Sequence, residues 1–517
     1  MIAFCRKKTS SAERGVALIM AMLVLLLVTA VGMGMIIMSN TETNISANFK
    51  DEQTAYFAAK GGIEEVRDRL RAGATNSVNL PVTLANTLPG AVGGILYVLN
   101  PLGTETVAPW LTTGTNYPDD QIGKELNCST GAPPVGIWWT TPQSASTSYA
   151  TSPTLQWKWV RIMAKVNKSD TTCTNVTSVD GNVNNNRVCW TGTHEIATAA
   201  ASCNAAGASY QPVYELTSLA VTSGGSRRMM QYEVSQNSFP TIPGAFVFDG
   251  SAPSFNPPNS GAFTVSGTDP LTHPGAGTYG SINGVACPVP VNEPALGSFD
   301  NPATSTLVAA MAGPPDRSGQ YTSGGYGVPA VSNMYSTLST DSINLTTVDG
   351  LTQFASMITT AAGPNVYANG VTPTNLGTTT SPVVNVVNGD LSVSGSGAGI
   401  LLVTGVLTLN GAFSWDGLVL AIGEGAIVKN GGGSAVVNGS MFAANLTTGN
   451  PGTGGPGAYP AAGYGTAIAL GSNNPPGKPF FGWSGGGSCT VQYDSCWVQA
   501  VTQSLPYHLI TQRELSY

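Results

Sequence analysis

The stretch that decides the fold is VALIMAMLVLLLVTAVGMGMIIM, residues 16–38, an uncharged run of 23 residues. At about 1.5 Å per residue, a helix of this length crosses the apolar part of a bilayer. Four basic residues precede the run, and the first charge after it is Glu42. This asymmetry predicts that the amino terminus stays in the cytoplasm and that the rest of the chain is exported. A cleaved secretory signal is the alternative, but its apolar core is shorter, about 7–15 residues.

A second helical pattern continues beyond this run. Apolar residues spaced by 4, 7, 7, 3 and 4 positions lie on one helical face: Ile45, Phe49, Tyr56, Ile63, Val66 and Leu70. Gly73 suits the end of such a helix. We therefore expect one nearly continuous helix over residues 16–72, roughly 85 Å long, with a bend at Gly61 and Gly62.

Gly15 lies directly before the apolar run, so cleavage there would leave the hydrophobic helix attached to the exported part. This arrangement resembles the class III leader of type IV pilins and type II secretion pseudopilins. The stretch NFKDEQTAYFAAKGGIEE, residues 48–65, resembles the N-terminal region of PilX-type minor pilins. The alternative is an amphipathic stalk behind an uncleaved signal anchor.

The resemblance implies a processing and assembly route. Prepilin peptidase would cut after Gly15, and the new amino terminus at Val16 would be methylated. The subunit would wait in the inner membrane as a single-pass protein with a periplasmic head. It would then enter an extracellular filament, where its helix packs against those of other pilins.

Met20 is a departure from the pattern of this family. Most major pilins have Glu at this fifth mature position, where it pairs with a neighbour's amino terminus. An unpaired charge in an apolar filament core is costly, so a subunit without this Glu does not neutralise the subunit it docks onto. The large minor pseudopilin of type II secretion also lacks the Glu and caps its filament. The analogy implies a tip or initiating position, with a tip adhesin or a secretion tip pseudopilin as alternatives.

The strand patterns that follow the long helix predict an α+β fold for the exported part. Residues 155–167, LQWKWVRIMAKVN, are typical of a buried strand, with Trp157 and Trp159 as core residues. Residues 213–221 and 227–235 flank the turn Thr222–Ser226 and predict a hairpin. A long helix followed by an antiparallel sheet is the plan of a pilin.

A different pattern follows in the C-terminal half. Asn-Gly pairs begin at Asn369, Asn388, Asn410 and Asn430, with short apolar runs between them. Regular turns at intervals of 19, 22 and 20 residues predict the rungs of a β-solenoid, or β-helix. A meandering sandwich would give similar local signals. Residues 346–517 also resemble the C-terminal half of large PilX-like proteins.

These patterns divide the chain into six parts. We expect a leader at 1–15, the helix at 16–72, a pilin-like β-rich head at 73–240, a Gly- and Pro-rich loop region at 241–345, a β-solenoid at 346–450, and a Gly-rich loop with closing strands at 451–517.

The cysteines predict disulfides, because the exported side is oxidising. Cys5 would leave with the leader, and seven remain. The pair Cys489 and Cys496 is the best candidate, because six intervening residues make a compact closure. The other candidates are Cys128, Cys173, Cys189, Cys203 and Cys287, and their pairing does not follow from the sequence. Since seven is odd, at least one thiol is free or bridges to another chain.

We expect no enzyme, no cofactor and no metal site. GWSGG (482–486) satisfies G-x-S-x-G, with Asp494 and His508 downstream, but the Gly-rich flanks do not suit a nucleophile elbow. The matches to G-x-G-x-x-G lack the strand and helix that dinucleotide binding requires. The opening of a calcium loop at residues 180–184 lacks its closing acid. No spacing of Cys and His indicates zinc.

Charge restricts the partners. Only 9% of residues are charged and the net charge is −7, which argues against a nucleic-acid partner, because such a partner would require a basic patch. From Val16 onward, 17 basic and 27 acidic side chains give −10, which disfavours electrostatic adhesion to anionic surfaces. A surface or glycan ligand remains compatible with the Asn- and Thr-rich C-terminal half. Outside the pilins, the alternative is a membrane-anchored periplasmic β-solenoid protein.

Overall fold

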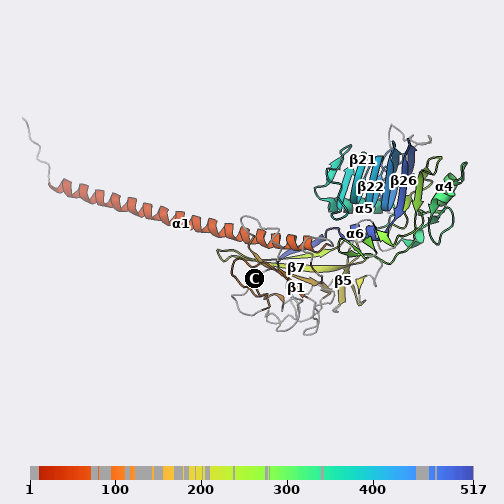
Figure 1. The fold of residues 1–517 in the computed structure, drawn as a ribbon. Helices are drawn as coiled ribbons and strands as arrows, with labels where there is room; N and C mark the ends of the chain where they lie inside the picture. The colour runs from red at the N-terminus through yellow and green to blue at the C-terminus, as the bar shows by residue number, and fades with distance from the viewer. Residues whose placement is uncertain are drawn as a thin grey trace, which may run out of the picture.

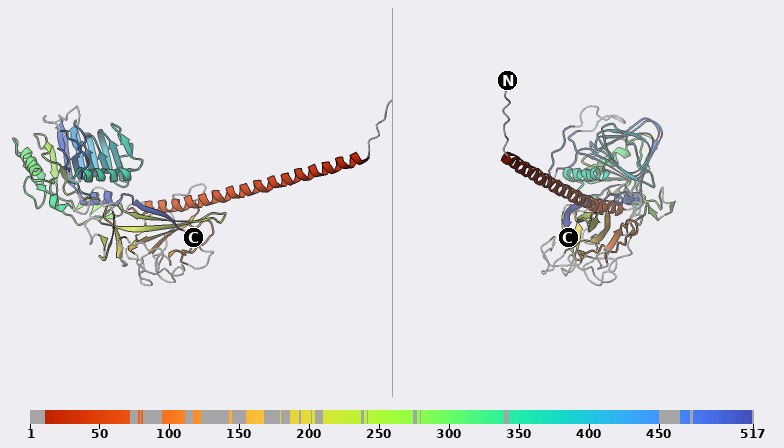
Figure 2. Two further views of the ribbon diagram at one scale, coloured as in Figure 1. Left: turned by 180° about the vertical axis from the view of Figure 1, so that it is seen from behind. Right: turned by 90° about the vertical axis from the view of Figure 1, so that its left-hand side faces the viewer.

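The structure is a computed structural model that describes residues 11–71, 78, 80, 95–110, 117–122, 143–144, 155–167, 179, 186–192, 194–200, 202–203, 210–236, 239–240, 242–273, 277–278, 280–338, 343–449, 465–471 and 474–515. Within these residues, the chain forms one long helix, a nine-stranded sheet and a 14-stranded sheet, besides two small hairpins. Figure 1 shows the helix extending far beyond the first sheet, and Figure 2 shows the same arrangement from two further sides.

The long helix, α1, spans Ser11–Arg69, so it begins earlier and ends sooner than expected. Residues 16–38 contain no Pro and no charge, and Arg67 and Arg69 in the last turn suit the negative end of the helix dipole. The helix runs through Gly61 and Gly62, where we expected a bend, because these glycines serve the packing described below.

The first sheet is antiparallel around the predicted hairpin. Strand β7 (Gln211–Val221) pairs from Val213 onward with the whole of β8 (Arg227–Ser235), which confirms the hairpin. The sheet continues through β3 (Trp157–Ala164) to β1 (Ile95–Leu99) on one side. Shorter strands extend it: β2 (Gln143–Ser144), β4 (Val166–Asn167), β5 (Asn186–Trp190) and β6 (Glu195–Thr198).

Both tryptophans of β3 are buried, as predicted, but on opposite faces of the sheet. The register between β3 and β7 shifts between Trp157 and Trp159, which marks a β-bulge. Trp157 therefore packs in the cluster under α1, whereas Trp159 packs with Tyr97 on the far face.

The second sheet is mainly parallel. Its longest strands are β21 (Leu391–Val403), β22 (Val406–Gly423) and β24 (Ser434–Asn445), which lie side by side in the order β21-β22-β24. The remaining strands of the sheet are β9 (Phe246–Asp249), β10 (Ser254–Phe255), β11 (Phe263–Ser266), β16 (Leu296–Ser298), β17 (Tyr321–Thr322), β18 (Val331–Asn333), β19 (Val366–Ala368), β20 (Val383–Asn388), β23 (Ala426–Asn430), β25 (Phe480–Ser484) and β26 (Ser488–Tyr493).

Three helices accompany this sheet: α4 (Asn301–Ala312), α5 (Val348–Ala362) and α6 (Ser495–Gln503). The small hairpins are β12 (Thr272–His273) with β13 (Gly277–Thr278), and β14 (Ser281–Ile282) with β15 (Val285–Ala286). Short 3-10 helices lie at Ser318–Gln320 and Tyr335–Thr337.

The long strands bend at a column of glycines. Gly399, Gly417 and Gly439 stand in register on β21, β22 and β24, with φ of 128°, 125° and 136°. A Cβ on Gly439 would lie 1.9 Å from the carbonyl oxygen of Gly417, and one on Gly417 2.3 Å from that of Gly399. Only glycine fits where the bent strands approach so closely.

The predicted β-solenoid is not confirmed. The Asn-Gly pairs at Asn369, Asn388 and Asn430 lie where strands end, but the pair at Asn410 lies within β22. The sheet order β10-β25-β23-β22-β24-β26-β11-β17 also interleaves segments that are distant in the chain. A solenoid would stack successive segments instead. The structure therefore supports a large β-rich domain with a parallel sheet, and nothing more specific.

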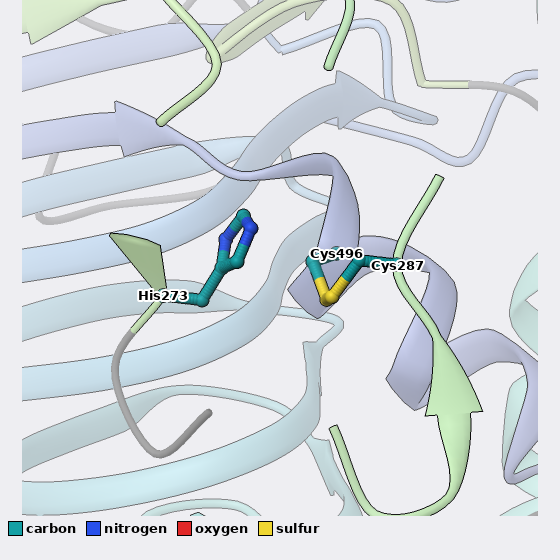
Figure 3. Close-up of side chains that lie close together, drawn as sticks. All are labelled: His273, Cys287 and Cys496. Carbon is teal, nitrogen blue, oxygen red and sulfur yellow. A yellow bond between two sulfur atoms is a disulfide. The ribbon is translucent and has the colours of Figure 1, made fainter. Parts of the chain in front are cut away.

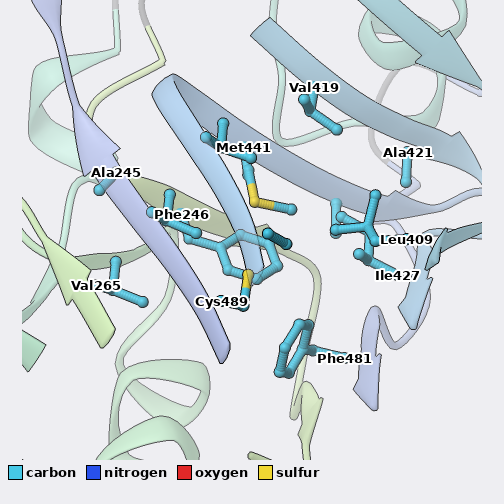
Figure 4. Packing of buried hydrophobic residues seen from close by; sticks show 14 of the residues in the cluster. Ala245, Phe246, Val265, Leu409, Val419, Ala421, Ile427, Met441, Phe481 and Cys489 are labelled. Carbon is cyan, nitrogen blue, oxygen red and sulfur yellow. The ribbon is translucent and has the colours of Figure 1, made fainter. Parts of the chain in front are cut away.

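The prediction of a loop region over 241–345 is wrong for much of that stretch. Strands β9, β11 and β16 pair within the large sheet. Phe246, Phe248 and Phe263 are fully buried in its core, and Figure 4 shows Phe246 and Val265 among residues from the C-terminal strands. Strands of two to four residues have no visible periodicity, so the sequence pattern hides them.

A last strand, β27 (His508–Leu515), returns to the first sheet and pairs antiparallel with β8. Nothing in the sequence predicted this pairing. The large sheet is therefore inserted between two neighbouring strands, and the Gln236 side chain donates to the carbonyl of Gln503 at 2.9 Å where the two connections meet. We call the first sheet, with the part of α1 packed on it, the head, and residues 242–503 the β domain.

Candidate functional site: the exposed part of the long helix

The first half of α1 projects away from the part of the head that the structure describes (Figure 1). Its large apolar side chains between Val16 and Met38 are 50–68% exposed. The 18-residue window of highest mean hydropathy reaches 2.8, and none of it is buried. By length and composition, this helix is long and apolar enough to cross a membrane.

The predicted processing residues lie at the start of this surface. Gly15 and Val16 both fall within α1, and Val16 is 62% exposed. Met20 is 59% exposed on the same helix, and no carboxylate occurs between Val16 and Thr41. The leader itself, up to residue 10 and including Cys5, lies outside the described residues.

The second half of α1 packs on the head sheet. Ala55, Ala58 and Ala59 are at most 2% exposed, and their small side chains let the helix approach β3, β7 and β8. Gly62 lies tightly against the sheet, since a Cβ there would lie 2.8 Å from Cγ of Trp157 and 3.0 Å from Oγ of Ser218. Gly62 is a contact residue, not a point of bending.

Polar contacts fix the helix on the head as well. The Arg228 guanidinium of β8 pairs with Glu52 of α1 at 3.0 Å and with Glu514 of β27 at 2.7 Å. Below the helix, burial raises the pKa of Tyr232, and the nearby carboxylate of Glu64 raises it further. Tyr232 therefore stays neutral beneath α1 at physiological pH.

The predicted apolar stripe is divided by this packing. Ile63 and Val66 are fully buried and Leu70 is 5% exposed, whereas Ile45 and Phe49 are 63% and 60% exposed. The sequence pattern alone does not reveal where the intramolecular contact begins. The polar residues 39–44 separate the exposed Ile45 and Phe49 from the apolar surface of residues 16–38.

The predicted disulfide between Cys489 and Cys496 is wrong. Cys496 bonds to Cys287 instead. Cys489 is a free thiol in the core of the β domain, where Figure 4 shows it among the packed apolar side chains. Cys489 and Cys496 are close in sequence, but strand β26 points Cys489 into the sheet's core while α6 carries Cys496 outside it. Burial raises the pKa of the Cys489 thiol to about 12.

The other described cysteines form one pair. Cys189 of β5 bonds to Cys203, which is one of the pairings left open by the sequence. Cys128 and Cys173 lie outside the described residues. Those residues therefore hold two disulfides and one free thiol.

The residues in hydrolase order do not form a triad. Asp494 caps α6 by accepting from the Trp497 amide, and it pairs with His273 at 2.8 Å. His508 lies in β27 of the head, with its ring 5.2 Å from that of Trp190. Sequence reasoning missed His273, whose partners lie more than 200 positions away.

A comparison with known families decides what the helix is. Residues 14–64 match the family described as PilX N-terminal. Most of helix α1 matches a PilX N-terminal region. The match covers about a tenth of the chain, and the PilX N-terminal region includes both the exposed apolar half and the start of the contact with the head.

The other comparisons add little to the PilX match. No curated protein matches the sequence. Among solved structures, the chain is similar to competence-associated pilin ComZ from Thermus thermophilus, with 10% identity and a TM-score of 0.18 over 90% of this chain and 97% of that one. A likeness at that TM-score carries no argument about the fold.

Proposed function

We propose that this chain is a minor pilin, a structural and assembly component of a type IV pilus-like filament. The observation that carries the proposal is the PilX N-terminal helix, whose first half exposes its apolar side chains. Burying a large apolar side chain contributes about 1.5–3 kcal/mol, so such a surface favours a membrane or a filament core by tens of kcal/mol. The mechanism is mechanical: α1 holds the subunit while the head and β domain protrude.

The proposed route begins with prepilin peptidase. The enzyme cuts after Gly15 and the amino group of Val16 is methylated, while the head lies on the periplasmic side. The apolar helix then leaves the inner membrane and packs against other pilins.

Processing is tested by the mass of the N-terminal peptide of protein from sheared extracellular filaments. The expected species begins at methylated Val16, and Gly15→Glu should keep the chain unprocessed and in the membrane. Gly34→Ala is the matched control, because a Cβ at Gly34 meets nothing within 4 Å. An intact Met1 found only in membranes refutes the pilin and leaves a membrane-anchored periplasmic protein.

Met20 supports a tip or initiating position. A helix without the usual Glu cannot neutralise the charged amino terminus of a subunit that it docks onto. A tip subunit does not need to neutralise such a charge. Labelled protein should lie at filament ends. Met20→Glu should allow incorporation along the shaft, and wild-type label along the shaft would refute the position while leaving the pilin assignment intact. Label confined to secretion-system filaments would favour the tip pseudopilin.

A tip adhesin is the second candidate, favoured by one face of the β domain. Strands β22, β24, β26 and β11 are neighbours in the sheet, and their outward side chains form two rows that run across the strands. Within each row, neighbouring residues come from strands about 4.8 Å apart. The rows are Ser414, Val436, Thr490 and Thr264, and Asp416, Asn438, Gln492 and Ser266. The alternate residues point into the core. Lateral hydrogen bonds, such as Thr264 to Thr490 at 3.1 Å, order these groups in advance.

The chemistry of this face suits a neutral, hydroxyl-rich glycan. Asp416 is the one residue in the two rows that carries a carboxylate. It is only 8% exposed, and it accepts a hydrogen bond from the Asn438 side chain at 2.8 Å. Filaments should sediment with an insoluble neutral polysaccharide, and Thr490→Lys should weaken this, unlike Thr352→Lys on the exposed side of α5. Equal sedimentation of both variants would refute adhesion through this face.

A further inference from the structure

A second cluster of chemically active groups lies in the β domain, away from α1. His273, Cys287 and Cys496 place their ligand atoms within 4.8 Å of one another, and Figure 3 shows the imidazole ring beside the two sulfurs. The three residues come from separate segments: β12, the residue after β15, and the first turn of α6. His273 and Cys496 are 4% and 1% exposed, and Cys287 is half-buried.

The histidine is held in a fixed orientation. Its Nδ1 lies 2.8 Å from Oδ1 of Asp494, a carboxylate that is fully buried. The same oxygen accepts from the Trp497 amide at 3.0 Å, which fixes the carboxylate at the start of α6. A carboxylate that holds Nδ1–H sets the tautomer whose Nε2 serves as a metal ligand, as in carboxylate–histidine–zinc arrangements.

The two sulfurs form a disulfide in this structure. We propose that, once this disulfide is reduced, the thiolates of Cys287 and Cys496 and the imidazole of His273 bind one Zn²⁺, with water as the fourth ligand. A dithiol reductant supplies two electrons and two protons and becomes a disulfide itself. Zinc then displaces the two thiol protons. Reoxidation by a disulfide acceptor removes two electrons, re-forms the Cys287–Cys496 bond and releases Zn²⁺.

The geometry requires only local movement. Bonds of about 2.3 Å to sulfur and 2.0–2.1 Å to nitrogen place tetrahedral ligand atoms about 3.5–3.8 Å apart. The imidazole therefore closes in by about 1 Å, and the sulfurs separate from bonding distance. Cys287 follows a two-stranded hairpin and is half-buried, so it is the sulfur ligand that moves, while α6 stays in place.

The zinc form would hold the same segments together as the disulfide. Cys287 and Cys496 are 209 positions apart, and their link joins the β14–β15 hairpin to α6, next to the connection that returns to the head. The β domain therefore keeps this cross-link in either redox state.

The test uses Co²⁺ as a spectroscopic probe for Zn²⁺, with full-length protein carrying Cys189→Ser and Cys203→Ser to remove the other described disulfide. Reduced anaerobically with a phosphine, this protein should bind one Co²⁺ per chain, with thiolate-to-cobalt charge transfer and tetrahedral ligand-field bands. Zn²⁺ should displace the Co²⁺. His273→Ala should weaken binding at least 10-fold, and Asp494→Asn by about 10–100-fold, the usual effect of a group that orients a metal ligand.

Two controls separate this site from other thiols. Cys489→Ala and His194→Ala should leave the spectrum and the affinity unchanged. Far-UV circular dichroism, with continued protection of Cys489 from a thiol reagent, reports whether the reduced β domain keeps its fold. The proposal is overturned by the absence of stoichiometric binding, by equal binding in His273→Ala, or by a reduced chain that unfolds before it binds.

Discussion

Replacing Gly62 by alanine tests the packing between α1 and the head sheet. A Cβ at Gly62 would lie 2.8 and 2.9 Å from Cγ and Cδ2 of Trp157, whose side chain is 1% exposed and has no room to retreat. At the neighbouring Gly61, the nearest atom is Cδ1 of Leu155 at 3.1 Å, the end of a flexible, partly buried side chain. Both substitutions gain the same helix propensity, about 1 kcal/mol.

The difference between the two variants therefore isolates the steric conflict. Overpacking a filled core costs about 1–3 kcal/mol, so Gly62→Ala should have a free energy of unfolding about 1–3 kcal/mol below that of Gly61→Ala. The assay is denaturant unfolding of the full chain in detergent, followed by tryptophan fluorescence and circular dichroism. Equal unfolding free energies for the two variants would contradict the close contact at Trp157.

Three further predictions concern the head. Arg161 and Asp119 form an ion pair with both side chains fully buried. Arg161→Met should therefore lower the free energy of unfolding by about 3–5 kcal/mol, and the double variant Arg161→Met with Asp119→Leu should lower it much less. Similar losses in the two variants would count against a buried charge pair. The double variant Cys189→Ala with Cys203→Ala removes a disulfide whose cysteines are 14 positions apart. It should lower the free energy of unfolding by about 3 kcal/mol, which would be measured as a lower Tm. An unchanged Tm would argue against the Cys189–Cys203 disulfide. Burial lowers the pKa of His508 to about 4 in the folded chain, against about 6.5 when unfolded. The unfolded chain therefore binds an extra proton between these values, and stability falls as the pH drops from about 6.5 to 4, by at most about 3 kcal/mol; His508→Gln should flatten that part of the stability profile, and a parallel profile would assign the loss to other groups.

The sequence was informative where a signal was local. The uncharged run at 16–38 and the periodic residues after it predicted α1, and Thr222–Ser226 between two β-rich runs predicted the hairpin of β7 and β8. Helix periodicity and turn chemistry depend on neighbouring residues, so one sequence is enough to read them.

The parts that sequence reasoning missed depend on contacts between distant segments. The return of β27 to β8 and the bond between Cys287 and Cys496 join residues more than 200 positions apart. The compact loop from Cys489 to Cys496 favoured the wrong pair, because loop length ignores which side of a strand a cysteine faces. The bulge between Trp157 and Trp159 likewise depends on the register of a partner strand.

The sequence predicted the apolar character of the candidate site, but it did not predict which residues of α1 are exposed. Residues 16–38 were expected to be buried in a membrane or among other helices, and the exposure of their apolar side chains in the single chain agrees with that expectation. The sequence did not show that Ile45 and Phe49 are exposed while Ile63 and Val66 are buried against the head, since all four share one periodic pattern.

The place of β27 in the head sheet has a consequence for biogenesis. A chain made and translocated from its amino end presents α1 first, while residues 508–515 follow only after the whole β domain. Until they arrive, β8 keeps an open edge, and an open edge invites pairing with other chains. Completion of the head is thereby coupled to delivery of the β domain, so that a prematurely terminated chain would offer the assembly machinery an unfinished head.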